Sequence, residues 1–302
     1  MANGTQVKKP SDKNWDETKI NSYADGEGNT IPVPKGFTPI PVEEGQGTKD
    51  TGFVIKDTST KADGTASQTN GNEFVWIPVE NMSYNYARYD FNKQYGNYSD
   101  YSETMPEDEQ TSVATYGGYY IGRYETGIEG GTLASTSNSS ITDTTEKQNW
   151  TGYTGGKLVV KEGQQVWNYI TRDRAKTEAE RLYNKEENNI KSKLISSYGW
   201  DTALKFIETQ NSTYPTNSVG GYYGQSSPTK TGYDTTHPGN IYDMGGNVWE
   251  WTTEFCSTAS SPCTLRGGCY YRSASAYPAA YRDYFSMTLA YGYFGFRVTL
   301  YM

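Results

Sequence analysis

Short runs of β-branched and aromatic residues alternate along the chain with polar, glycine-rich stretches. Such residues favour extended, half-buried backbone, and four runs therefore predict strands: residues 72–80 (NEFVWIPVE), 116–127 (YGGYYIGRYETG), 264–271 (TLRGGCYY) and 295–302 (GFRVTLYM). A further stretch, residues 239–252, combines glycines that permit tight turns with two tryptophans at alternate positions. Trp249 and Trp251 are expected to supply core bulk.

Two segments in the middle of the chain follow the helical period instead. The first, residues 172–189, comes after Thr171, a residue type that caps helix N-termini. The second is expected to begin near Asp201. Each carries an apolar stripe that should face the core: Ala175, Ala179, Leu182 and Tyr183 in the first, and Trp200, Ala203, Leu204 and Ile207 in the second.

The other segments are polar and typical of loops. Residues 1–71 hold proline-rich extended pieces, so we expect an N-terminal extension with short edge strands, packed on or leading into the main domain. Residues 81–115 predict a long surface insertion, and a Ser/Thr-rich loop is expected at 130–150. The sequence thus predicts a loop-rich α+β protein with two helices and twisted antiparallel sheets, whose main domain spans residues 72–302.

Charge and composition exclude several classes of function. The chain has 27 Lys and Arg against 35 Asp and Glu, a net charge of -8, and no basic stripe, so nucleic acid is not an expected partner. No apolar run is long enough to span a bilayer, so direct membrane insertion is not expected. Hydrophobic residues make up only 34% of the chain, but aromatics reach 15%, which predicts an aromatic core and argues against disorder.

Few side chains are suited to metal binding or catalysis. His237 is the only histidine and no CxxC pair exists, so neither a metal site nor a cofactor is expected. Cys256 and Cys263 bracket a short polar loop and could form a disulfide, or both could be reduced. Asp243 and Glu250 offer a carboxylate pair that glycoside hydrolysis would need, and the acidic run at 106–110 could hold an ion or be solvated.

The C-terminal stretch from Arg266 to Arg297 uses a restricted alphabet. It contains seven tyrosines and many small residues, but no Lys, Glu, Gln or Trp. Tyrosine presents a large amphipathic surface with little rotamer entropy to lose, while Ser, Gly and Ala make room around it. Core packing is the alternative for any single tyrosine, but the segment as a whole favours an adaptable binding surface.

Several motifs occur in an order that resembles a known family. The segments NEFVWIPV, YYIGRYE, NIYDMGGNVWEW, LRGG and GFRV resemble the formylglycine-generating-enzyme-like (sulfatase-modifying factor) domain, a variant of the C-type lectin fold. The resemblance implies a copper site made by two cysteines after the Gly-Gly turn. The corresponding positions hold Arg272 and Tyr277, and Cys269 lies nearer the turn, so we expect the fold without the chemistry. An oxidase using Cys269 with a second cysteine is the enzymatic alternative.

The same fold resembles that of the variable proteins of diversity-generating retroelements. In those proteins the segment before GFR is a ligand-binding face, in which adenine-directed mutagenesis of Asn codons never yields Lys, Glu, Gln, Met or Trp. Between positions 269 and 294 only Met287 falls outside the accessible set, so Met287, Pro278, Ala279 and Arg282 are expected to be fixed. The expected ligand contacts are Tyr271, Arg272, Ser273, Ala276, Tyr277, Tyr281, Asp283, Tyr284, Phe285, Ser286, Leu289, Tyr291 and Tyr293.

This resemblance also implies a setting for the protein. A diversified receptor would bind an unknown protein or cell-surface ligand and be displayed outside the cell, on a cell or virion surface. Trp249, Trp251, Arg266 and Arg297 would form its fixed scaffold, with an arginine paired to Glu250 beneath the face. An invariant surface or pilus-associated module is the remaining alternative, in which the C-terminal segment would not vary.

Overall fold

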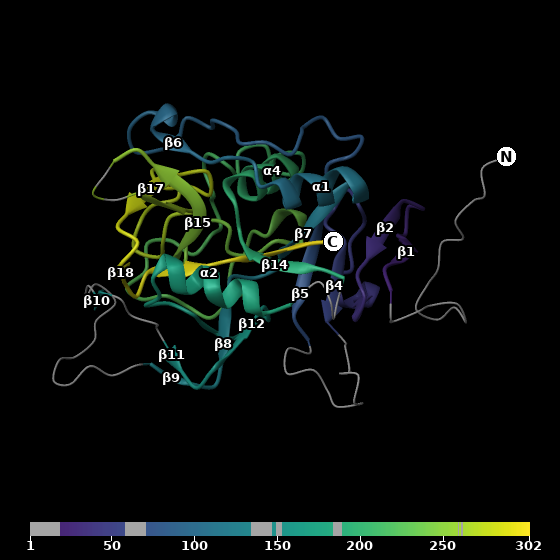
Figure 1. Ribbon diagram of the computed structural model, residues 1–302, viewed down its shortest axis with the longest axis horizontal. Coiled ribbons are helices and arrows are strands. Elements are labelled where there is room, and N and C mark those ends of the chain that lie inside the picture. Colours follow the sequence, from purple (N-terminus) through teal and green to yellow (C-terminus); the bar gives the residue numbers. More distant parts are fainter. Residues whose placement is uncertain are drawn as a thin grey trace.

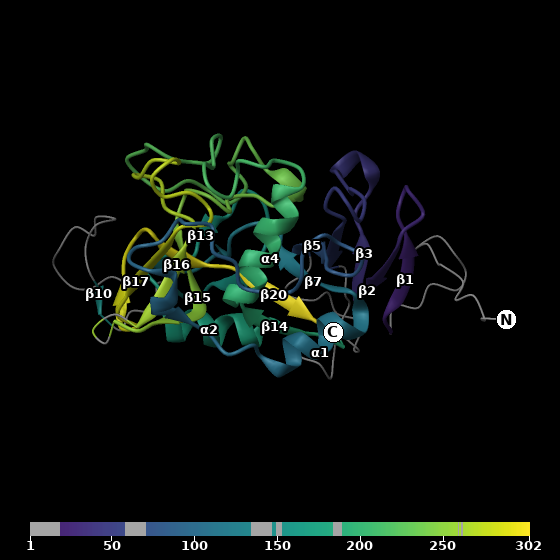
Figure 2. The ribbon, with the colours of Figure 1, turned by 90° about the horizontal axis from the view of Figure 1, so that it is seen from above.

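The computed structural model describes residues 19–57, 71–133, 147–148, 153–183, 189–258, 260 and 262–302 (Figure 1). Most of the loop expected at 130–150 lies outside these residues. Within them, no helix has the length and apolar character needed to cross a bilayer. The first strands, β1 (Asn21–Ala24) and β2 (Thr30–Val33), lie at the opposite end of the molecule from β17 (Arg282–Phe285), as both views show (Figures 1 and 2).

A six-stranded antiparallel sheet forms the centre of the molecule. Its strand order is β14 (Lys191–Leu194), β20 (Val298–Tyr301), β7 (Gly118–Gly122), β5 (Glu73–Pro78), β4 (Val54–Asp57) and β3 (Phe37–Pro39). The strands predicted at 72–80, 116–127 and 295–302 are confirmed. Because β4 pairs directly with β5, the sheet continues across the boundary expected at 71/72, and β3 is its edge strand.

A second, five-stranded sheet carries the C-terminal segment. Its order is β17 (Arg282–Phe285), β16 (Cys263–Arg266), β15 (Trp249–Cys256) and β19 (Phe294–Phe296), and β6 (Tyr101–Ser102) also pairs with β15. The β15–β19 pair is parallel and the others are antiparallel. The chain therefore leaves this sheet after β16, rejoins it at β17 and, after leaving it once more, returns at β19, so that both ends of the segment between β16 and β19 are fixed.

Smaller elements complete the structure. They are the β1–β2 hairpin, the pairs β9 (Thr132–Leu133) with β11 (Tyr153–Thr154) and β10 (Lys147–Gln148) with β18 (Leu289–Ala290), the trio of β12 (Lys157–Val159), β8 (Gly127–Glu129) and β13 (Gln165–Val166), and three 3-10 turns, η1 (Val42–Glu44), η2 (Tyr98–Asp100) and η3 (Pro238–Asn240).

The described residues contain three α-helices, where the sequence predicted two. The unexpected one, α1 (Glu107–Tyr116), lies in the stretch predicted as a surface insertion. The predicted helices are α2 (Arg172–Arg181) and α4 (Ser197–Glu208). Thr171 is the N-cap residue of α2, but its side chain makes no capping hydrogen bond. Helix α4 begins four residues before the expected Asp201, because the Ser196 hydroxyl accepts a capping hydrogen bond from the Gly199 N–H at 3.1 Å.

The central sheet separates two hydrophobic cores. Successive side chains of a strand point to opposite faces. Phe74 and Trp76 of β5 therefore join the core that contains α2 and both predicted tryptophans, Trp249 and Trp251. Val75 and Ile77 join the core that contains α4. Figure 1 shows α4 on one side of the sheet and α2 on the other. The core roles predicted for the two tryptophans and for the apolar stripes of α2 and α4 are confirmed.

The three cysteines are buried free thiols. Cys263 lies opposite Phe255 in the β15–β16 pair, and Cys256 is the next residue of β15. Directly opposed residues share a face of a sheet and adjacent residues of a strand do not, so Cys256 and Cys263 point to different faces. Of the two alternatives left by the sequence, the structure therefore favours the reduced one.

The thiols of Cys256, Cys263 and Cys269 should resist alkylation in the folded protein and all three should react in denaturant without reductant. Burial excludes the reagent, and it raises the pKa of Cys263 to about 11 and that of Cys269 to about 12, which removes the reactive thiolate. Mass spectrometry after iodoacetamide treatment measures this, with Cys256→Ser as the control. If only Cys269 is labelled in the denatured chain, Cys256 and Cys263 form a disulfide.

Candidate ligand-binding face

The segment between β16 and β19 runs along one end of the molecule. Residues 269–281 form a loop, after which the chain rejoins the five-stranded sheet as β17, leaves it to form β18 and returns to it at Phe294. All thirteen residues predicted to contact ligand are exposed or half-buried. In the same segment Pro278, Ala279, Ala280, Arg282, Ala290 and Gly292 are buried, whereas Ala274, Ser275 and Thr288 are not. Met287 was expected to belong to the fixed scaffold, but it is 36% exposed and packs in neither core.

Most of the aromatic residues predicted to contact ligand touch one another in a continuous group. We call this group the tyrosine cluster; it consists of Tyr271, Arg272, Tyr277, Tyr281, Phe285, Tyr291 and Tyr293. The rings of Tyr291 and Tyr293 stack with centroids 4.8 Å apart, and Tyr271 meets Tyr293 edge-on at 5.2 Å. Tyr277 and Tyr281 lie 4.8 Å apart, and the Arg272 guanidinium lies over the rings of both Tyr271 and Tyr277.

The tyrosine cluster rests on two buried aromatic residues. Trp249 contacts Tyr277 and Tyr281 at ring distances of 6.1 and 5.8 Å. Phe294 contacts Phe285 and Tyr291, each at 5.0 Å. Since both supporting rings belong to the core, the half-buried residues above them present one side to the scaffold and the other to solvent.

Tyr284 lies apart from the tyrosine cluster. Side chains alternate along β17, so Asp283 and Phe285 share the face of the cluster while Tyr284 points to the other. There its ring meets Tyr95 at 5.5 Å and Tyr101 at 6.4 Å. Tyr95 is 58% exposed and was not predicted as a site residue. Among the remaining predicted contacts, Ser273 and Ala276 lie exposed on the loop, and Ser286 and Leu289 are half-buried beside β18.

The backbone of the loop is held from both sides by segments far away in the sequence. The backbone N–H groups of Gly224 and Gln225 donate to the carbonyls of Arg272 and Tyr270 at 3.1 and 2.7 Å. On the other side, the Lys93 ammonium donates to the Ser275 carbonyl at 3.1 Å. Because these bonds use the main chain of the loop, its path does not depend on which side chains project outward.

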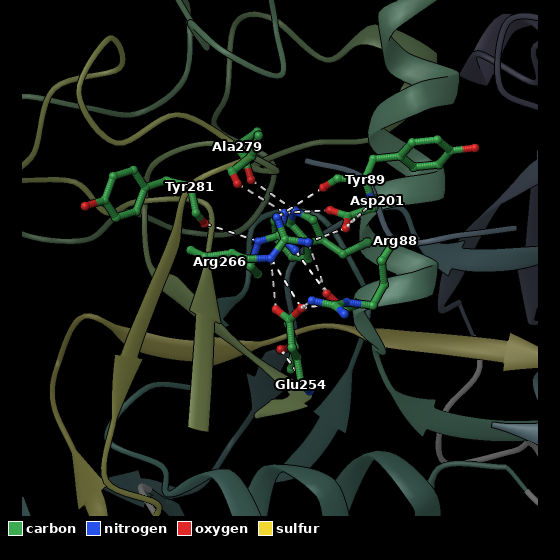
Figure 3. Close-up of polar contacts among 12 residues, drawn as sticks. Arg88, Tyr89, Asp201, Glu254, Arg266, Ala279 and Tyr281 are labelled. Atoms are coloured by element: carbon green, nitrogen blue, oxygen red, sulfur yellow. Dashed lines mark hydrogen bonds and ion pairs between the residues drawn. The ribbon is translucent and has the colours of Figure 1, made fainter. Parts of the chain in front are cut away.

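A buried network of charges lies under the loop and β17 (Figure 3). The Asp201 carboxylate of α4 pairs with Arg266 at 2.7 Å and with Arg282, and Arg282 pairs with Glu254 at 3.0 Å. Arg88 reaches Glu254 at 2.6 Å. Arg266 also donates to the carbonyls of Tyr281 and Ala280 at 3.2 Å each, so the network fixes the main chain at the end of the loop.

The predicted arginine–Glu250 pair is present, but Arg297 alone forms it. The Arg297 guanidinium donates to both Glu250 oxygens, at 2.6 and 3.0 Å, and all of these atoms are buried. Arg266, which was considered for the same role, pairs with Asp201 instead. Asp243 accepts the Gly232 N–H at 2.6 Å and is also buried, so Asp243 and Glu250 present no carboxylate pair to a substrate in solvent.

Within the described part of the chain, side chains of the types that bind metal do not gather at one place. Among the residues that the structure describes, no three His, Cys, Asp or Glu side chains lie close enough together to hold an ion. The acidic run at 106–110 instead begins α1, where Asp108 pairs with Lys193 at 2.9 Å. Arg272 and Tyr277 occupy the two positions where the resemblance implied copper-binding cysteines.

Replacing Asp201 by Asn should destabilise the protein by about 3–5 kcal/mol, because it leaves two buried arginines short of negative charge. Urea unfolding measures the loss. The control is Lys176→Ala, which removes an exposed pair with Glu180 and should cost less than about 1 kcal/mol. If both variants unfold at the same urea concentration, the network contributes no more than a surface pair.

Glu103 should make stability fall as pH rises from 5 to 8. Burial raises the pKa of Glu103 in the folded protein to about 7. When the pH rises above the lower pKa that Glu103 has in the unfolded chain, the unfolded chain loses the Glu103 proton while the folded protein still holds it. The unfolding free energy should therefore drop by about 2–3 kcal/mol more in wild type than in Glu103→Gln across that window. Glu43→Gln, an exposed control, should keep the wild-type slope. Equal slopes for all three proteins would contradict the assignment.

Comparison with protein families identifies the same family that the order of sequence motifs indicated. The sulfatase-modifying factor enzyme 1-like domain matches residues 46–301, and a search of curated proteins gives no match. Three of the solved structures that are similar to this chain are CarF, PvdO from Pseudomonas aeruginosa and Treponema denticola variable protein 1. CarF has 13% sequence identity and a TM-score of 0.34, and the match covers 45% of this chain and 67% of CarF. PvdO has 12% identity and a TM-score of 0.39, with 62% of this chain and 82% of PvdO covered, and the variable protein has 11% identity and a TM-score of 0.29, with 94% and 99% covered. The family match covers most of the chain, which therefore belongs to the family of sulfatase-modifying factor enzyme 1-like domains.

Proposed function

We propose that this protein is a non-catalytic receptor or adhesion-type protein whose C-terminal face binds a protein or cell-surface ligand. In this proposal the domain has the C-type lectin fold variant, and a diversity-generating retroelement varies the residues of the face. The protein acts outside the cell, on a cell or virion surface. It needs no cofactor for this role.

One observation carries the proposal, namely the division of the segment into outward and inward positions. Every residue expected to vary has an exposed or half-buried side chain. Of the four residues expected to stay fixed, Pro278, Ala279 and Arg282 are buried, and Met287 is the exception. The Trp200 indole N–H donates to the Ala279 carbonyl at 3.0 Å, and Arg282 belongs to the buried charge network. Variation at outward positions would therefore change the surface while the backbone keeps its supports.

The chemistry of the outward positions fits recognition of a protein. Tyrosine and arginine are enriched among the residues that dominate binding at protein interfaces. Tyrosine buries much area with only two side-chain torsions, and arginine offers several hydrogen-bond donors in a fixed plane. The aromatic contacts within the tyrosine cluster hold these side chains in place before a ligand arrives. Such preorganisation lowers the entropy lost on binding.

The oxidase alternative has little support in the positions of the thiols. Cys269 is buried, and burial raises its pKa to about 12, so its thiol is protonated. Cys263 is at the start of β16 and Cys269 lies beyond its end, so the strand alone separates them by roughly 10 Å. A copper site needs thiolates on the same ion.

Sequencing of the 3′ end of this gene in one natural population, with its flanking DNA, tests the proposal. Substitutions should concentrate at the outward positions between 269 and 294, beside a near-identical template repeat. Codons for Pro278, Ala279 and Arg282 should stay constant, and residues 72–133 provide the internal control for background variation. An unchanged segment without a repeat would show an invariant module, and oxygen consumption on addition of copper would show an oxidase.

A further inference from the structure

Arg272 is held in an unusual position within the tyrosine cluster. The centre of its guanidinium lies 4.9 Å from the ring centroid of Tyr271 and 4.7 Å from that of Tyr277. Its backbone is fixed as well, since its N–H donates to the Cys269 carbonyl at 3.0 Å and its carbonyl accepts from Gly224. A long cationic side chain has thus lost much of its freedom before any ligand binds.

Arg272 also differs from the other arginines in its lack of a carboxylate. Each of the others has a carboxylate oxygen of a described residue within 4.0 Å, as do the scaffold arginines Arg266, Arg282 and Arg297. Among the same residues, Arg272 has no such neighbour, and its buried Nε finds no hydrogen-bond acceptor. The positive charge of Arg272 is therefore not compensated by a carboxylate of a described residue, and an anion supplied from outside would provide one.

The Asp283 carboxylate could compete with a ligand for Arg272. Asp283 lies on the face of β17 that carries the tyrosine cluster. Its Oδ1 accepts the backbone N–H of Tyr284 at 2.8 Å, and it forms no ion pair with Arg272 within 4.0 Å. The two groups are close enough for Arg272 to stabilise the Asp283 carboxylate. Asp283 therefore weakens the attraction of this face for a second carboxylate but does not occupy the Arg272 donors.

We propose that Arg272 is the specificity-determining residue of the face and that it binds a carboxylate of the protein ligand, an Asp or Glu side chain flanked by apolar residues. This inference rests on the proposed function. The guanidinium offers parallel N–H donors that match a carboxylate in two bonds. The surrounding tyrosine rings exclude water from the pair and bury the apolar flanks, the arrangement in which charged pairs contribute most to affinity.

Selection from a displayed random peptide library tests the inference without a known ligand. The library is selected in parallel on the immobilised full chain, on Arg272→Ser and on Ser275→Ala. Ser275 is an exposed residue of the same loop that is not among the predicted ligand contacts, and it serves as the control. Peptides enriched on wild type and on the control should carry Asp or Glu beside apolar residues. A synthesised acidic peptide should bind Arg272→Ser at least about tenfold more weakly, and its Asp→Asn version should lose as much on wild type.

Two further variants sharpen the test. Arg272→Lys keeps the charge but not the paired donors, so it should recover only part of the affinity. Asp283→Asn removes the competing carboxylate and should strengthen binding of the acidic peptide. Enriched peptides without an acidic preference, or equal binding by Arg272→Ser, would overturn the inference and leave the proposed function standing. If no peptide is enriched above the bare support on any variant, both are refuted.

Discussion

The structure of the candidate ligand-binding face depends on one carboxylate, that of Asp201 in α4. It lies between two arginines, Arg266 at the end of β16 and Arg282 at the start of β17, the residues between which the loop leaves and rejoins the sheet. Both guanidiniums and the carboxylate are fully buried. Burying charge is costly unless it is paired with good geometry, so few other arrangements of these elements would be compatible with the same side chains. The network thus selects one path for the loop.

In the proposed function, that selection would let the side chains of the candidate face vary while its backbone path stays the same. The loop is held by groups that no outward substitution removes, namely the buried arginines, the main-chain bonds to Gly224 and Gln225, and the indole of Trp200. The outward side chains add contacts among themselves but do not determine the backbone. A residue of the hydrophobic core cannot be substituted as freely, because the close packing of its own side chain holds that part of the backbone in place.

The sequence predicted the parts of this structure that have a local signal. Strands such as β5 are recognisable from their residue types and α4 from its apolar period, whereas the polar sequence of α1 has no apolar period. Its local signals were those of the helix ends, namely a proline followed by three acidic residues at the start and Gly117 after the end. The charge network was missed because Asp201 and its partners are 65 to 81 residues apart. One local signal existed, a carboxylate among the apolar positions of α4, which requires a cationic partner.

Contacts between the outward residues limit how independently each of them can vary. Tyr271 touches both Arg272 and Tyr293, and Tyr293 stacks on Tyr291, so replacing one ring changes the surroundings of the next. Residues in contact give non-additive effects, whereas distant ones add. Tyr284, on the opposite face of β17, shares no ring contact with the tyrosine cluster and is free of this coupling. The candidate face therefore consists of one coupled group and a separate position, and in the proposed function its binding properties would follow from combinations of residues within that group.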